Sequence, residues 1–393
     1  MSPRARRAVL VLLDGFDPRY VQLERMPTVA RLMAEGSSTL AGTDVLPTLT
    51  NVNHVSVVTG AYPERHGIST NYYFQRGTGR EVFMDTVDFV QEKLIFEWAQ
   101  AAGCSTALIT AKAKLTRLLN RGLDHSIDMT HHPADLRPTV GTPPDVYSAE
   151  INLWVLRMAR EILRRHRPRL AYVATTDYME HKYAPDEPPM QQQAADMDAL
   201  LGEMLREVDL GETVVAVFAD HGMNAKTRAV SPVRALGQAG IRARGLPLIK
   251  DGLYEHHRDL GGALYLYLED PGASRQAQAV LASTEGVDEV VPQAEVGRLH
   301  LPPDRVGDLV AFAGPAHVFG IWAEGPVGRD EYHLRSHGSK HEQTVPILLC
   351  GAGVRRGARL EAARTIDLTP TVLHLLGVPA RNLQGRILEE ALD

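Results

Sequence analysis

Three aspartates in the sequence each follow a short apolar segment. They are Asp14 after AVLVLL, Asp177 in AYVATTDYMEHK and Asp220 in VVAVFADHGMN. A single acidic residue at the end of a strand is most often a helix cap or a turn former. If the three segments are strands of one parallel sheet, however, their carboxyl ends meet at one edge. We therefore expect the three carboxylates to converge.

Three histidines add a second kind of metal ligand. His221 is next to Asp220, and His181 lies four residues after Asp177, so that in a helical turn the two share a face. His337 precedes a late apolar segment. Mixed carboxylate and imidazole ligands suit zinc, and manganese or iron could take its place. With a nucleophile oxygen added, the set is large enough for two neighbouring ions.

The candidate nucleophile is Thr50, in the segment VLPTLTNVNHVSVVTGAYPERHGI. Pro47 breaks regular structure, and Val52–Thr59 has the pattern of a helix that ends at Gly60. Thr50 therefore falls at a helix N-terminus, where free backbone N–H groups bind phosphoryl oxygens. Taken alone, Thr50 would be a helix N-cap. Beside a two-metal site, its hydroxyl can lose its proton near neutral pH and act as a nucleophile.

Short β-branched apolar segments alternate with helical patterns along most of the chain. This alternation predicts an α/β fold, a sandwich in which helices flank a mostly parallel, doubly wound central sheet. The expected strands are Ala8–Leu13, Ser105–Ile109, Leu170–Ala174, Val214–Ala219 and Val345–Cys350. The expected helices are Thr28–Glu35, Val52–Thr59, Leu94–Ala102, Ser148–Arg165 and Met190–Glu207.

The pattern changes between residues 224 and 334, where Gly and Pro are frequent. Short strands at Ala263–Leu268 and Val318–Trp322 flank a helical segment at Ser274–Ala282, and the main sheet resumes at Val345. We predict a small α+β cap inserted into a catalytic α/β core. Residues 1–223 and 335–393 would form the core, and residues 224–334 the cap.

The composition excludes several classes of protein. The chain has 393 residues, a net charge of −6 and two cysteines, Cys104 and Cys350. The mild negative charge argues against nucleic-acid binding, and the cysteine spacing argues against a thiolate zinc site. No apolar stretch approaches the ~20 residues of a membrane span, and the first apolar segment is short for a signal peptide. We expect a cytoplasmic protein without a membrane partner, and a homodimer is one assembly that the sequence allows.

Together these motifs resemble the nucleotide pyrophosphatase/phosphodiesterase branch of the alkaline phosphatase superfamily. The likeness rests on Asp14 after the first strand and on the blocks TLTNVNH, TGAYPERHGI, TTDY, EHK, ADHG and SHG, with MPTVARLMAEGS and TIDLTPTVLHLLGVP nearer the ends. It implies an alkaline-phosphatase-like fold and a threonine that is phosphorylated during the reaction. In the implied ligand sets, one zinc ion is held by Asp177, His181 and His337, and the other by Asp14, Thr50, Asp220 and His221.

A closer resemblance, to the phosphonoacetate hydrolases, shows in HGISTNYYF, TAKAKLTRLLNRGL, TTDYMEHKYAP, ADHGMNAK and RSHG–EQTVP. It implies that Asn71 contacts the phosphonate and that Lys112 and Lys114 bind the anionic substrate, including its carboxylate. Two lysines at the start of a helix oppose the helix dipole, so a bound anion accounts for them better than solvent does. The chain departs from the family in SHGSKHEQ, where His341 could compete as a metal ligand or contact the substrate.

The resemblance implies a zinc-dependent hydrolase that cleaves the carbon–phosphorus bond of phosphonoacetate, giving acetate and phosphate through a phosphothreonine at Thr50. Its partner would be a small anionic phosphonate or phosphate. The alternative is a phosphodiesterase or phosphomonoesterase with the same metals, in which Tyr72, Tyr73 or Phe74 could stack on a nucleotide. A protein that only senses anions is disfavoured because all six ligands and the nucleophile are present. An arylsulfatase is disfavoured because no C/S-x-P-x-R motif surrounds Thr50.

Overall fold

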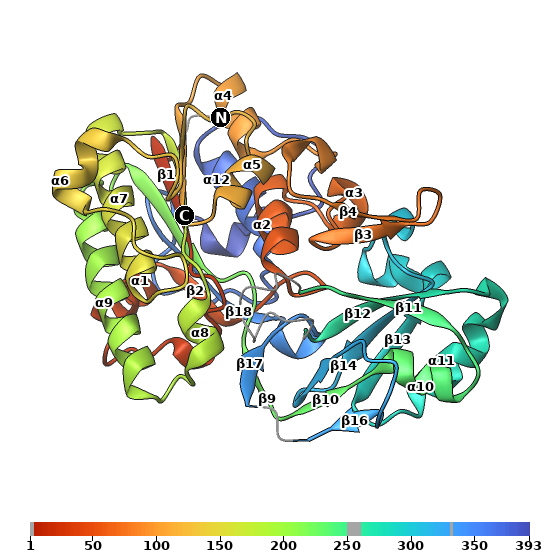
Figure 1. Ribbon diagram of the computed structural model, residues 1–393. Coiled ribbons are helices and arrows are strands. Elements are labelled where there is room, and N and C mark those ends of the chain that lie inside the picture. Colours follow the sequence, from red (N-terminus) through yellow and green to blue (C-terminus); the bar gives the residue numbers. More distant parts are fainter. Residues whose placement is uncertain (1–3, 250–260, 331–332) are drawn as a thin grey trace.

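A sheet of seven strands lies at the centre of the protein (Figure 1). The structure is a computed structural model and describes residues 4–249, 261–330 and 333–393. From edge to edge the strands are β2 (Ser37–Thr43), β18 (Thr344–Gly351), β8 (Thr213–Phe218), β1 (Arg7–Leu12), β7 (Leu170–Ala174), β5 (Thr106–Thr110) and β6 (His125–Ile127).

Most of this sheet is parallel, as predicted. The neighbouring strands β8, β1, β7, β5 and β6 run in one direction, whereas β18 is antiparallel to both of its neighbours, β8 and β2. Because β18 is reversed, its first residues lie at the edge where the parallel strands end. Segments that follow β1, β7 and β8 therefore meet the segment that precedes β18.

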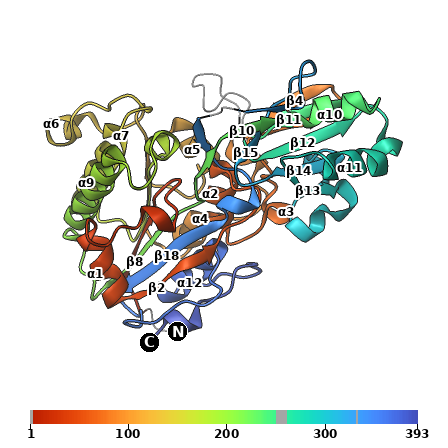
Figure 2. The same cartoon turned by 90° about the horizontal axis from the view of Figure 1, so that it is seen from below.

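The strands are apolar on both faces because helices cover both faces. β1 reads RAVLVL and β8 reads TVVAVF, and both are buried along nearly their whole length. One helical layer is α1 (Pro27–Glu35), α7 (Glu150–His166) and α9 (Pro188–Leu205); the other is α2 (Thr50–Thr59), α4 (Ile95–Ala101) and α12 (Leu368–Leu375) (Figures 1 and 2). Shorter elements are α3 (Pro63–His66), the hairpin β3 (Tyr72–Gln75) and β4 (Arg80–Phe83), α5 (Ala113–Leu118), α6 (Arg137–Val140) and α8 (Tyr178–Lys182).

The strands and helices expected in the core are all present, with bounds shifted by two residues or fewer. β2 was not predicted, since SSTLAGT has no continuous apolar run and forms the edge of the sheet. One expected strand, Val318–Trp322, is wrong at its end, because β15 spans His317–Phe319. The Trp322 ring folds back over Gly320, where an added Cβ would lie 2.1 Å from it, so the chain turns at this glycine.

Residues 224–334, here called the insertion, leave and rejoin the core through a neck in which β9 (Asn224–Lys226) pairs antiparallel with β17 (Leu334–Ser336). Its main sheet has the order β11 (Ala243–Pro247), β12 (Ala263–Leu268), β14 (Leu309–Ala313) and β13 (Val287–Pro292). The other elements are β10 (Arg228–Val230), β16 (Gly328–Arg329), α10 (Pro232–Gln238) and α11 (Ser274–Ala282). That the insertion is a domain of its own stays a prediction.

The inserted sheet buries both of its faces. Tyr265, Val310 and Phe312 belong to the main core, whereas Leu264 and Leu266 pack in a second core with α10 and α11. Successive side chains of a strand point to opposite faces, which explains this alternation. The insertion is thus attached to the core through one face of its sheet as well as through the neck.

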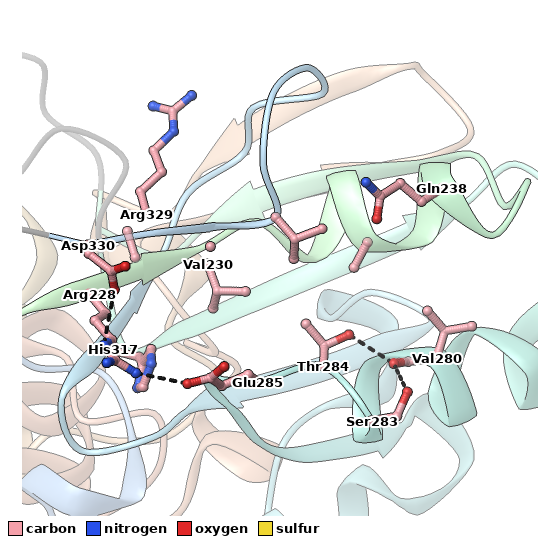
Figure 3. A pocket seen from close by; sticks show the side chains of 14 residues that line it. Arg228, Val230, Gln238, Val280, Ser283, Thr284, Glu285, His317, Arg329 and Asp330 are labelled. Atoms are coloured by element: carbon pink, nitrogen blue, oxygen red, sulfur yellow. Dashed lines mark hydrogen bonds and ion pairs between the residues drawn. The ribbon is translucent and has the colours of Figure 1, made fainter.

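A cavity of about 540 Å³ lies within the insertion, between α10, α11, β10 and β16 (Figure 3). Arg228 at its rim is already paired, with Glu285 at 2.8 Å and Asp330 at 3.1 Å. Val230 and Val280 line the interior. Paired charges and an apolar interior do not suit a small anion, so we do not place a substrate there. Within the described residues, no helix is long and apolar enough to cross a membrane.

Phe312→Ala is expected to lower the free energy of unfolding by about 3–5 kcal/mol. The reason is that its ring is fully buried where the inserted sheet meets the main core. Leu266→Ala, in the second core, is the matched variant. Urea unfolding followed by circular dichroism should show one transition for both variants, since the shared core couples the two parts. Two transitions, of which Leu266→Ala shifts only one, would contradict this coupling.

Candidate metal centre and nucleophile

The three predicted aspartates lie together at the carboxyl edge of the sheet. Asp14, Asp177 and Asp220 stand just beyond the ends of β1, β7 and β8, and all three are buried. Backbone bonds tie these strand ends together: Asp14 N–H donates to Thr175 Oγ1 at 3.0 Å, and Gly15 N–H donates to Asp220 Oδ1 at 3.1 Å. Gly15 has a φ of +70°, and a Cβ there would lie 2.9 Å from Asp177 Cβ. The turn after β1 therefore requires glycine.

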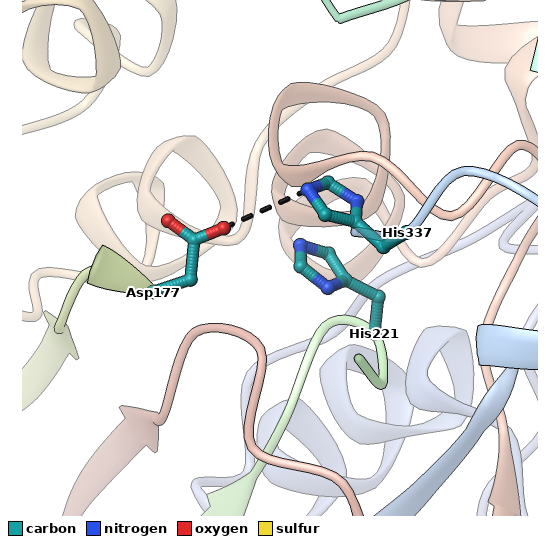
Figure 4. Close-up of side chains that lie close together, drawn as sticks. All are labelled: Asp177, His221 and His337. Carbon is teal, nitrogen blue, oxygen red and sulfur yellow. Dashed lines mark ion pairs between the residues drawn. The ribbon is translucent and has the colours of Figure 1, made fainter. Parts of the chain in front are cut away.

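The aspartates and histidines form two overlapping groups, in each of which the ligand atoms lie within 4.8 Å of one another. One group is Asp14, Asp220 and His221; the other is Asp177, His221 and His337 (Figure 4). His221 belongs to both, and its ring stacks on that of His337 with a centroid distance of 3.7 Å. Two adjacent carboxylate–imidazole groups are an arrangement that can hold a pair of transition-metal ions.

His181 lies beside the second group. Its Nε2 is 3.0 Å from Asp177 Oδ2, and its ring centroid is 5.4 Å from that of His337. The sequence resemblance places His181 in the ligand set with Asp177 and His337, whereas the tightest group in the structure contains His221 there. How the ligands divide between the two ions stays a prediction.

All three histidines present the same ring nitrogen to the carboxylates. Each Nδ1 lies within hydrogen-bond distance of a backbone carbonyl oxygen, which can only accept, so Nδ1 carries a proton and donates it. This leaves Nε2 to face the centre, and such outer bonds commonly orient the histidines of metal sites. The carbonyls belong to Arg335 for His181 (2.8 Å), Gly222 for His221 (3.0 Å) and Thr48 for His337 (2.6 Å).

The charges of the buried carboxylates indicate that the site suits cations. Burial and the charge of Asp14 raise the pKa of Asp220 well above its ordinary value. Burial opposes ionisation of Asp177 as well, but the nearby charge of Lys112 holds its pKa well below its usual range. Asp14 Oδ1 and Asp220 Oδ2 are buried and accept no hydrogen bond from the described residues. Such oxygens are costly to bury without a partner, and ligation of a metal ion would satisfy them.

Thr50 lies beside His221, the residue that both groups share. It is the first residue of α2, and Leu49 occupies the N-cap position, so Thr50 is not the helix cap that a lone threonine would suggest. Its Oγ1 lies 3.4 Å from His221 Nε2, and the residue is partly exposed. The hydroxyl therefore stands beside the metal-ligand group, at a helix end with free backbone N–H groups.

Lys112 lies between the two groups of ligands. Its Nζ is 3.0 Å from Asp14 Oδ2 and 3.4 Å from Asp177 Oδ1. Burial would lower the pKa of Lys112, but the carboxylates of Asp14 and Asp177 raise it above its ordinary value, so the ammonium persists at neutral pH. Lys114 lies in the first turn of α5 and Asn71 directly before β3, and both are half-buried. The roles of these three residues toward a substrate stay predictions.

His341 points away from the centre, and the interpretation that it competes as a metal ligand is wrong. Its Nε2 lies 3.1 Å from Asp288 Oδ2 on β13, and Lys340 Nζ lies 2.8 Å from the same carboxylate oxygen. Both residues belong to the one-turn helix η8 (Lys340–Glu342). The unusual SKH sequence after His337 therefore attaches this loop to the insertion.

Sequence analysis missed two residues that support the site, Arg335 and Thr48. The guanidinium of Arg335 donates to the carbonyl oxygens of Glu180 at 2.9 Å and Met223 at 3.1 Å, and so joins α8 to the loop after His221. Thr48 Oγ1 accepts the Gly338 N–H at 2.9 Å. Their positions within the RSHG and VLPTLT segments are the only signal that the sequence offers.

The sheet, its two helical layers and the carboxylate–imidazole groups at its carboxyl edge are the fold and site of the alkaline phosphatase superfamily. The chain belongs to the type I phosphodiesterase / nucleotide pyrophosphatase family, which matches residues 8–340. The resemblance drawn from the sequence blocks is thereby confirmed.

Solved structures extend the comparison over the whole chain. Phosphonoacetate hydrolase from Sinorhizobium meliloti 1021, solved in complexes with phosphonoformate and with phosphonoacetate, has a TM-score of 0.83 and 30% identity, with 96% of each chain covered. The closer resemblance to phosphonoacetate hydrolases is therefore confirmed. Human ectonucleotide pyrophosphatase / phosphodiesterase 5 has a TM-score of 0.76 at 19% identity over 98% of this chain and all of that one, which is a likeness of fold.

Two curated relatives match a smaller part of the chain. Ectonucleotide pyrophosphatase/phosphodiesterase family member 5 of Homo sapiens is 27% identical over 230 residues, which are 57% of this chain and 46% of that protein. An uncharacterized pyrophosphatase/phosphodiesterase of Schizosaccharomyces pombe is 24% identical over 55% of this chain and 44% of its own length. The chain therefore spans less than half the length of these two relatives.

We expect the purified protein to bind two transition-metal ions per chain and to lose hydrolytic activity when a chelator removes them. Asp220→Ala should lose metal as well as rate, because Asp220 belongs to the first ligand group. His341→Ala is the control and should keep both ions, since its ring contacts Asp288. Elemental analysis paired with a hydrolysis assay tests this. Full activity with one ion or none would rule out a two-metal centre.

Proposed function

We propose that the chain is a metal-dependent hydrolase that cleaves the carbon–phosphorus bond of phosphonoacetate to give acetate and phosphate. Its cofactors would be two zinc ions, with manganese or iron able to substitute. The observation that carries the proposal is the likeness, over 96% of both chains, to a phosphonoacetate hydrolase solved with phosphonoacetate. The arrangement of Thr50, Lys112 and the two ligand groups at one edge of the sheet supports it.

The proposed ligand sets follow the sequence resemblance. Zinc bound at these groups would neutralise the carboxylates and polarise the phosphoryl oxygens. The carbonyl bonds to Nδ1 of each histidine keep the rings oriented before a substrate enters. The proposed sets are Asp14, Thr50, Asp220 and His221 for one ion, and Asp177, His181 and His337 for the other.

In the proposed reaction, the deprotonated Thr50 Oγ1 attacks phosphorus and forms an oxygen–phosphorus bond as the phosphorus–carbon bond breaks. The departing carbon keeps the electron pair of that bond, delocalises it into the carboxylate and takes up a proton to become acetate. The Lys112 ammonium, held at the centre by Asp14 and Asp177, stabilises this developing negative charge. Water then attacks the phosphothreonine, which releases phosphate and restores Thr50.

The alternative, a phosphodiesterase or phosphomonoesterase, is favoured by the description of the matching family. The packing of two of the three expected stacking residues, Tyr72 and Phe74, counts against nucleotide binding. The Tyr72 ring is buried and stacks on Phe83 at 5.1 Å. The Phe74 ring packs edge-on against Tyr267 at 5.3 Å and beneath the guanidinium of Arg244 at 4.4 Å. Both rings are thus engaged within the protein.

Thr50→Ala should lower turnover by several orders of magnitude while the metal content stays unchanged, because the remaining ligands hold the ions. Thr50→Ser should keep part of the activity, since a hydroxyl remains at the same place. Turnover and metal content are measured on the same samples. If Thr50→Ala hydrolysed phosphonoacetate at nearly the wild-type rate, water would be the direct nucleophile and the proposal for Thr50 would be wrong.

Lys114→Ala is expected to cost roughly 2–5 kcal/mol of transition-state stabilisation with phosphonoacetate, the range for removing one partner of a buried charge pair. The cost should be much smaller with p-nitrophenyl phosphate, whose leaving group has no carboxylate. Lys112→Ala should impair both substrates, because its ammonium also contacts Asp14 and Asp177. The ratio of kcat/KM values for the two substrates separates these effects.

Lys93→Ala is the matched control, since Lys93 is exposed and lies over the Trp98 ring, and it should leave both kcat/KM values unchanged. Equal losses on both substrates in Lys114→Ala would mean that Lys114 serves the phosphoryl group or the fold. Wild-type protein that cleaves bis-p-nitrophenyl phosphate rapidly but not phosphonoacetate would support the phosphodiesterase alternative.

A further inference from the structure

A fully buried ion pair lies beside the neck of the insertion. Lys226, the last residue of β9, and Glu342, in η8, approach to 2.8 Å between Nζ and Oε1, and both side chains have 0% exposure. Taking two charges out of water is expensive, and an apolar pair of similar volume is often as stable. Both residues lie in the blocks that carry His221 and His337, ADHGMNAK and RSHG–EQTVP, but the proposed mechanism gives neither of them a role.

Glu342 binds the loop that carries His337. Its Oε2 accepts from Ser339 twice, from N–H at 3.0 Å and from Oγ at 2.7 Å. Its Oε1 accepts from Asn224 Nδ2 at 2.6 Å in addition to Lys226 Nζ. Each carboxylate oxygen thus has two donors, which fixes the direction of the side chain. Glu342 therefore connects the first strand of the neck to the loop after His337.

The same loop is held from its other side by the segment that precedes the nucleophile. Thr48 Oγ1 donates to the Ser339 carbonyl at 2.9 Å and accepts the Gly338 N–H at 2.9 Å. The Thr48 carbonyl accepts from His337 Nδ1 at 2.6 Å. The His337 loop is therefore clamped between Glu342 and Thr48, and Thr48 lies two residues before Thr50.

We propose that Lys226 and Glu342 are positioning residues for the metal centre. The pair holds the His337 loop so that His337 Nε2 faces Asp177 Oδ2, 3.6 Å away. It thereby sets the affinity with which the ligand group that contains His337 binds a metal ion. The other group depends less on it, because Asp14 and Asp220 are placed by β1 and β8. This inference rests on the proposed two-metal function and extends it to residues outside the ligand sets.

Glu342→Gln tests the proposal, because it keeps the size of the side chain and removes its charge. The backbone bond from Gly222 N–H to the residue 342 carbonyl, 2.7 Å in the structure, is retained. The affinity for one of the two zinc ions should fall by roughly 10- to 100-fold, the usual effect of losing an outer-shell partner. The affinity for the other ion should stay within twofold of the wild-type value. Lys226→Met should have a smaller effect, since Glu342 keeps its bonds from Asn224 and Ser339. Equilibrium competition between the zinc-loaded protein and a chelating dye resolves the two affinities.

Two further variants separate positioning from general effects. Glu161→Gln removes another buried carboxylate, which pairs with Arg164 near the end of α7 and so lies toward the opposite edge of the sheet. It should leave both zinc affinities unchanged. The double variant Lys226→Met/Glu342→Gln removes both charges, so its melting temperature should recover relative to Glu342→Gln, while the lost zinc affinity should not.

The outcomes distinguish the possible roles of the pair. Recovery of zinc affinity in the double variant would mean that a stranded Lys226 charge had caused the loss, and would overturn the positioning role. Equal losses of affinity for both zinc ions together with a lower melting temperature would overturn it as well. No change in either affinity would do the same. If Glu342→Gln does not fold, Lys226→Met still decides, since unchanged zinc affinities there would contradict the proposal. Wild-type protein that binds two ions but cleaves neither phosphonates nor phosphate esters would refute the proposed function and leave this inference intact.

Discussion

The mutual repulsion of three buried carboxylates is the constraint that shapes the carboxyl edge of the sheet. Asp14, Asp177 and Asp220 lie in one cluster, and like charges away from water cannot all stay ionised without cations nearby. Lys112 supplies one positive charge, between Asp14 and Asp177. The oxygens that accept no hydrogen bond remain available for metal ions, whose charge would complete the balance. Thr50 stands at the side of this cluster, where a phosphoryl group would meet the same charges.

Orientation of the imidazoles depends on backbone carbonyls rather than on acidic side chains. The acceptors for His181, His221 and His337 come from three separate segments of the chain. Neutral acceptors hold the rings without adding negative charge to a cluster that already has three carboxylates. The reversed direction of β18 matters here, because it returns the His337 segment to the same edge as the ends of β1, β7 and β8.

The insertion is attached to this edge in several ways. One face of its sheet joins the main core, and its neck enters directly after the His221 loop and leaves directly before His337. Lys340 and His341 contact Asp288 on β13, and the Lys226–Glu342 pair connects the neck to the His337 loop. A change in the placement of the insertion would therefore reach a candidate metal ligand through short contacts, of which the Lys226–Glu342 pair is fully buried.

The sequence by itself determined most of the strands and helices and the kinds of residue at the edge of the main sheet. The first and last residues of Leu170–Ala174 and of Ser274–Ala282 were predicted correctly, because apolar periodicity and turn residues are local signals. Tertiary structure alone decided where the long polar side chains point. Lys112 bridges carboxylates that follow β1 and β7, and His341 turns outward to Asp288, more than fifty residues away in the chain. Such directions depend on contacts between distant segments, and the spacing of residues along one segment carries no information about them.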